Sequence, residues 1–164
     1  MPVKRCRLRD RTAGYALLEA LVAVIVTSIG FIGAARLQTL GLSFNNSAMY
    51  RQKATLLGYQ MTDRMRANQS GLSLGAYNNP TPGDTACLAA GCTPAALAQA
   101  DAAAWAADLA AQLPDGRGVV CSDSTPDDGT PDAPACDGVG KLLAVKVWWS
   151  DTLGTSRFVT IARP

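Results

Sequence analysis

The chain has 164 residues, enough for about one domain, and it contains no histidine. Catalytic sites that depend on an imidazole, such as Ser-His-Asp triads, Cys-His pairs and His-ligated metal centres, are therefore excluded. The net charge of +2 is unevenly spread, since residues 1–14 and 36–66 each carry +4 and residues 67–164 carry −5. An acidic C-terminal part lacks the basic face that nucleic-acid binding requires, so we expect no nucleic-acid partner.

The first predicted element is an apolar helix over residues 15–35, in which Glu19 is the only charged residue. At about 1.5 Å per residue, such a helix is about 30 Å long, which matches the hydrocarbon core of a bilayer. The basic residues before it favour a cytoplasmic N-terminus, so the chain after Ala35 is expected to be exported into an oxidising compartment.

Three interpretations of residues 15–35 differ in how they treat Glu19. A cleaved secretory signal could be cut after Gly33-Ala34-Ala35, but its apolar region is usually about 7 to 15 residues long. A plain membrane anchor explains the length but not the carboxylate, because a charge near the membrane centre costs about 2.5 to 3.5 kcal/mol on insertion scales. The third interpretation gives Glu19 a function.

The residues Gly14 to Glu19, which read GYALLE between a short basic leader and the apolar run, resemble the prepilin motif of type IV pilins and type II secretion pseudopilins. The resemblance implies that a prepilin peptidase cuts between Gly14 and Tyr15, removes the leader 1–14 and methylates the new N-terminal amine. It also implies that Glu19 acts in assembly by pairing with the α-amine of a neighbouring subunit. The chemistry agrees, because a buried ammonium group requires a partner.

After the apolar segment, the helix is predicted to continue as an amphipathic extension over residues 36–68. No proline lies between Pro2 and Pro80, and apolar residues recur mostly at intervals of three or four positions. They are Leu37, Leu40, Phe44, Ala48, Ala54, Leu57, Met61 and Met65. We therefore expect one helix from Tyr15 to about Arg66, with residues 40–66 packed against a globular head.

Residues 38–71 are similar to the minor pilins called type IV pilus modification protein (PilV-like). The matching positions are Asn46, Ser47, Arg51, Ala54, Leu57 and the run Asp63-Arg64-Met65-Arg66-Ala67-Asn68. This similarity favours the minor-pilin branch over the type II secretion pseudopilins.

The head, residues 69–164, contains Cys87, Cys92, Cys121 and Cys136, whereas Cys6 lies in the leader. Four cysteines allow three connectivities, and local pairing of Cys87 with Cys92 and of Cys121 with Cys136 is the simplest. A zinc site of four thiolates is the alternative, disfavoured by the oxidising compartment and the lack of CxxC spacing. Calcium bound by the aspartates of residues 123–132 would lack EF-hand spacing, so no metal or cofactor is expected.

The secondary structure of the head is predicted to be one helix and three strands. Thr93 is a suitable N-cap before Pro94, and the helix that follows places Leu97, Trp105, Leu109 and Leu113 on its core face. Residues 118–122 form a candidate strand. A hairpin is predicted from two further strands, residues 141–150 and 157–163, joined by the turn 151–155. In the first strand of that hairpin, one face carries Leu143, Val145, Val147 and Trp149, and the other face carries Lys146 and Trp148.

The expected fold is α+β and pilin-like: a long N-terminal helix, half transmembrane and half amphipathic, packs on a small disulfide-bonded head with an antiparallel sheet and one extra helix. The resemblance implies a minor pilin that helps to initiate or tip a type IV pilus used in twitching motility and adhesion. Its partners would be the prepilin peptidase, other minor pilins and the major pilin, contacted through the N-terminal helix.

The implied location is first the inner membrane, spanned once with the N-terminus cytoplasmic and the head periplasmic, and then the pilus on the cell surface. A type II secretion minor pseudopilin is one alternative. A membrane-anchored periplasmic enzyme is another, but the sequence offers no pair of nucleophile and base for it, and no catalytic residue is expected.

Overall fold

The computed structural model describes residues 13–152 and 154–163. The leader predicted for residues 1–14 thus lies outside the described residues, except for its last two positions. The chain divides into two compact units, Met1–Phe44 and Asn45–Pro164. We call the second one the head unit.

Helix α1 runs from Ala13 to Ala67 and crosses the boundary between the two units. Its continuity follows from the absence of proline and from the many alanine and leucine residues, which favour helix. The cations Arg64 and Arg66 in its last turn complement the helix dipole. The structure thus contains the long N-terminal apolar helix that the sequence predicted.

Beyond α1 the head unit contains three further helices and three strands. The helices are α2 (Gln69–Ser73), α3 (Cys87–Ala90) and α4 (Pro94–Gln112). The strands are β1 (Arg117–Ser122), β2 (Leu143–Asp151) and β3 (Gly154–Ala162). The prediction of one extra helix is confirmed by α4, where Thr93 accepts a hydrogen bond from the Ala96 N–H. The sequence did not predict the two short helices α2 and α3.

The three strands form one antiparallel sheet in the order β1-β2-β3. Val145 on the central strand pairs with Val120 on one side and with Thr160 on the other. The hairpin is tighter than predicted, because β2 continues to Asp151 and pairs there with Gly154. Gly154 has a φ of 117°, a backbone conformation that glycine adopts without steric cost.

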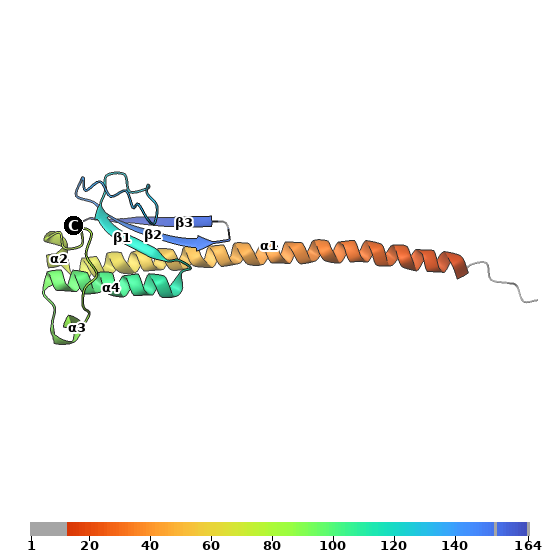
Figure 1. The fold of residues 1–164 in the computed structure, drawn as a ribbon, viewed down its shortest axis with the longest axis horizontal. Coiled ribbons are helices and arrows are strands. Elements are labelled where there is room, and N and C mark those ends of the chain that lie inside the picture. Colours follow the sequence, from red (N-terminus) through yellow and green to blue (C-terminus); the bar gives the residue numbers. More distant parts are fainter. Residues whose placement is uncertain (1–12, 153, 164) are drawn as a thin grey trace, which may run out of the picture. The chain divides into compact units, whose positions relative to one another are not determined.

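The core of the head unit lies between the sheet, α4 and the last turns of α1. Figure 1 shows the sheet and α4 beside this end of α1. Trp105 of α4 fixes the two helices together, since its Nε1–H donates to the Leu57 carbonyl at 2.9 Å. The part of α1 that packs against the head starts later than residue 40, where the sequence predicted it to begin. Ala48 is exposed, and burial begins at Tyr50 and Ala54. On α4, Leu97 is only half-buried and Ala98 takes the core position.

A buried polar network joins the end of α1 to α4. The Asn68 side chain accepts from the Gly71 N–H and donates to the Tyr77 hydroxyl, which donates to Asp101 Oδ2 at 2.5 Å. Burial and the hydrogen bond to Asp101 raise the pKa of Tyr77 well above its usual value. Tyr77 is completely buried, so this network closes one end of the core.

Candidate functional site

The apolar half of α1 exposes a continuous series of large hydrophobic side chains. Between residues 15 and 35 every described side chain is exposed, with Tyr15 82% and Phe31 72% accessible. Monomeric soluble proteins rarely expose an apolar surface of this extent, because its contact with water is unfavourable. The segment is therefore suited to lipid or to another protein surface.

The hydroxyl groups of Thr27 and Ser28 in this segment are satisfied within the helix. The hydroxyls of Thr27 and Ser28 donate to the carbonyls of Ala23 and Val24, each at 2.6 Å. Such internal pairing is what a helix needs in hydrocarbon, where no water is available. By length and composition α1 can cross a membrane, although a signal sequence near the N-terminus has the same properties.

The residues predicted for processing and assembly lie at the start of this helix. Gly14 and Tyr15 are in the first turn of α1, and Glu19 follows one turn later with its side chain exposed. Further along, a Cβ added at Gly30 or Gly33 would meet no atom within 4 Å. Such small positions allow a second helix to approach closely.

In the head unit, the four cysteines form two disulfides. Cys87 is bonded to Cys92, and Cys121 is bonded to Cys136. These are the two local pairs expected from the sequence. The first bond joins the start of α3 to the residue before Thr93, and the second closes the loop that follows β1.

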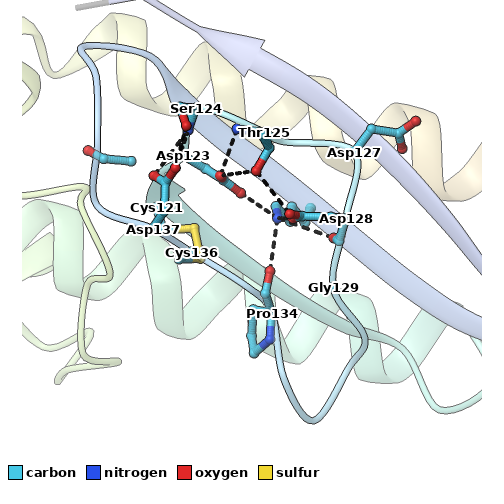
Figure 2. A network of polar contacts seen from close by, with 12 residues as sticks. Cys121, Asp123, Ser124, Thr125, Asp127, Asp128, Gly129, Pro134, Cys136 and Asp137 are labelled. Carbon is cyan, nitrogen blue, oxygen red and sulfur yellow. Dashed lines mark hydrogen bonds and ion pairs between the residues drawn. A yellow bond between two sulfur atoms is a disulfide. The ribbon is translucent and has the colours of Figure 1, made fainter.

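The loop over residues 123–142 crosses the sheet face that points away from α1, and Lys146 is its buried anchor. Lys146 on β2 is completely buried, and its Nζ lies 2.5 Å from Asp123 Oδ2, which is equally buried. The ammonium group also donates to Asp128 Oδ1 and to the Pro134 carbonyl, each at 2.8 Å. These three partners come from both halves of the loop, and Figure 2 shows Asp123, Asp128 and Pro134 close together, joined by dashed lines.

Lys146 and Asp128 each favour the ionised form of the other. Burial of the Lys146 ammonium lowers its pKa, but the hydrogen bonds to Asp123 and Asp128 outweigh this effect and raise the pKa above its usual value. The hydrogen bond from Lys146 in turn lowers the pKa of Asp128. Asp137, which accepts from Ser124 and from the Val139 N–H, also has a lowered pKa.

The other loop carboxylates that the sequence had suggested as calcium ligands contact cations of the same chain. Asp127 pairs with Arg157 at 2.8 Å, and Asp132 pairs with Arg117 at 2.6 Å. Within residues 13–152 and 154–163, no group of three potential metal ligands occurs. The aspartates of this loop therefore tie it to the sheet.

Sequence reasoning did not identify the anchoring role of Lys146. The pattern placed Lys146 and Trp148 on the face of β2 opposite the core, where one would expect access to solvent, but both are buried under the loop. An indication was present in the strand LAVKVWW, where one lysine stands among apolar residues on both faces. A charge in such a setting needs partners from elsewhere in the chain.

Comparison with known proteins adds no assignment: no family model, no curated protein and no solved structure matches this chain.

Proposed function

We propose that the protein is a minor pilin that is processed by a prepilin peptidase and enters a type IV pilus, where it helps to initiate or tip the filament. The observation that carries the proposal is Glu19, the only charged residue of the exposed apolar segment 15–35 and the fifth residue after the junction of Gly14 and Tyr15. The resemblance of residues 14–19 and 38–71 to this family supports it.

Processing would give the chain a new N-terminus at Tyr15. Cleavage between Gly14 and Tyr15 would leave a cationic amine at the start of an apolar helix, and this charge is costly in lipid or in a filament interior. Glu19 of a neighbouring subunit would pair with it and set the stagger between the two helices. The protein would thus span the inner membrane once before extraction, with the head unit in the periplasm.

The first experiment is the intact mass of the membrane-extracted protein, expressed with and without a prepilin peptidase. We expect loss of residues 1–14 and gain of one methyl group only when the peptidase is present. An uncut chain in both samples would leave a simple anchored domain, and a cut after Ala35 would leave a secreted one. Either result would contradict the proposal.

The second experiment tests Glu19 by the amount of protein in sheared pili. Glu19→Gln and Glu19→Ala should be inserted and cleaved normally but be lost from pili, because the amine then lacks its counter-charge. Glu19→Asp retains the carboxylate and should keep part of the incorporation. Normal incorporation of both neutral variants would show that Glu19 has no assembly role. Presence in pili would also favour the pilus over a type II secretion pseudopilus.

A further inference from the structure

The two edges of the sheet differ in what covers them. In an antiparallel ladder, the backbone N–H and C=O of alternate residues point away from the neighbouring strand. On β1 the chain itself occupies these groups: the Asn79 N–H donates to the Val120 carbonyl at 2.8 Å, and the Ser122 N–H donates to the Asn78 side chain at 2.8 Å. The Gly138 N–H donates to the Ser122 carbonyl at 3.0 Å, so three bonds close this edge.

No described residue covers the β3 edge in this way. Counting from the pair Asp151–Gly154 that closes the hairpin, the residues whose backbone points outward are Thr155, Arg157, Val159 and Ile161. The pairing of β1 with β2 leads to the same four residues. The backbone N–H and C=O of Val120 point away from β2, so the backbone groups of its pair Val145 must form their hydrogen bonds with β3. No described residue outside the ladder forms a hydrogen bond with the backbone of these four residues. Exposed edges of this length are usually blocked, because they pair with any available strand.

Apolar side chains lie beside this open edge. The rings of Phe158 and Tyr59 are 6.0 Å apart in an edge-to-face arrangement, and Tyr59 is 51% exposed. Phe158 reaches α1 because residue 58 is glycine, where a Cβ would lie 2.7 Å from the ring. Ile161 on the same strand is 44% exposed. An added strand would therefore find apolar contacts as well as hydrogen bonds.

Charges near the edge indicate what kind of strand fits. Arg51 is exposed and lies seven residues before Gly58, two helical turns away on the same side of α1. Arg163 is exposed and follows the end of β3. Neither arginine forms an ion pair with a described residue. A second copy of this edge would bring the same cations and be repelled, whereas an acidic strand would neutralise them.

We propose that the β3 edge accepts an extended, acidic segment of a partner subunit, which adds a fourth strand to the sheet. The proposal rests on the proposed function, in which the partners are other pilus subunits. Backbone hydrogen bonds to the four outward residues would supply most of the affinity, and the contacts with Phe158 and Tyr59 would set the register.

Val159→Pro tests the edge directly. Proline removes the outward N–H of residue 159 but no bond to β2, and edge strands tolerate proline at such positions. The matched variant Val159→Thr keeps both the N–H and the β-branched shape. We expect the Val159→Pro protein to be cleaved by the peptidase and to form both disulfides. Its amount in sheared pili should fall about tenfold, because losing one well-packed hydrogen-bonded contact has an effect of this size. Val159→Thr should match the wild type.

Charge reversal tests the chemistry of the partner strand. Arg163→Glu should reduce the amount in pili, and Arg163→Lys should not, if the added strand is acidic. An equal amount of both variants would overturn the acidic assignment.

Hydrogen exchange of the wild-type chain keeps the proposal testable if the proline variant fails to fold. The peptide covering residues 155–161 should exchange more slowly in pili than in detergent-extracted protein. Equal exchange in the two states, or full incorporation of a folded Val159→Pro, would overturn the strand addition while the pilus function stands. Absence of the wild type from pili would instead contradict the proposed function.

Discussion

Lys146 Nζ lies 2.5 Å from Asp123 Oδ2, and neither side chain has any exposed surface. Removing two charges from water is costly, and the cost is recovered only when every remaining donor finds an acceptor. Here the other ammonium hydrogens donate to Asp128 and to the Pro134 carbonyl. The pair therefore joins the central strand to both halves of a loop that contains little regular structure.

Removal of the lysine should destabilise the head strongly. Lys146→Met would leave the Asp123 carboxylate buried without a counter-charge, which costs about 3 to 5 kcal/mol. The free energy of unfolding of the full chain in detergent, followed by tryptophan fluorescence in urea, measures this loss. The double variant with Asp123→Leu removes both charges and should recover much of it. A Lys146→Met protein as stable as the wild type would show that the pair is unimportant.

The stability of the head should decline at both ends of the pH scale. The hydrogen bond from Lys146 holds the pKa of Asp128 below its usual 3.8, so this contribution is present above pH 3.8 and is lost as the pH falls through the lower folded value. The pKa of Lys146 is raised above 10.5, so its contribution is present below pH 10.5 and is lost as the pH rises through the folded value.

The measurement is the urea midpoint as a function of pH, with Lys146→Met as the comparison. The raised pKa of Tyr77 adds a second alkaline loss, because its buried hydroxyl resists ionisation. Lys146→Met should therefore weaken the alkaline decline without abolishing it. An unchanged profile in this variant would contradict the role of the lysine.

The two disulfides should contribute unequally. Cys121 and Cys136 are 15 residues apart and Cys87 and Cys92 are 5 apart, and loop-closure entropy gives about 3 and about 2 kcal/mol for loops of these lengths. Paired serine variants, one pair at a time, should lower the free energy of unfolding in that order. Alkylation without reductant should label no cysteine of the wild-type head unit. Labelling of all four would contradict both bonds.

A glycine in β1 should be intolerant of any side chain. A Cβ at Gly118 would lie 2.3 Å from Trp105 Cη2 and 2.6 Å from Leu109 Cδ1. Gly118→Ala should therefore displace the indole and destabilise the head by about 1 to 3 kcal/mol through overpacking. Thermal unfolding measures the loss, and near-ultraviolet circular dichroism reports the displaced tryptophan. Adding Trp105→Phe should relieve part of the clash.

Features that depend on local pattern could be predicted from the sequence. The spacing of Leu57, Met61 and Met65 predicted the buried face of α1, and Thr93 with Pro94 predicted the start of α4. The alternation of Val145, Val147 and Trp149 predicted the core face of β2. These signals are local because helix and strand periodicity arises within a few residues.

Other features depend on residues that are distant in sequence. The burial of Lys146 and Trp148 required the loop to fold back over the sheet, and the contrast between the closed β1 edge and the open β3 edge depends on where Asn78 and Asn79 lie.

By itself, the sequence determined an apolar N-terminal helix with one carboxylate, an α4 helix, three strands and a set of four cysteines. The tertiary structure decided which edge of the sheet is covered and which charges are buried together. The physical reason is that the partners of a buried charge or of an edge strand come from segments far along the chain, where no local periodicity indicates them.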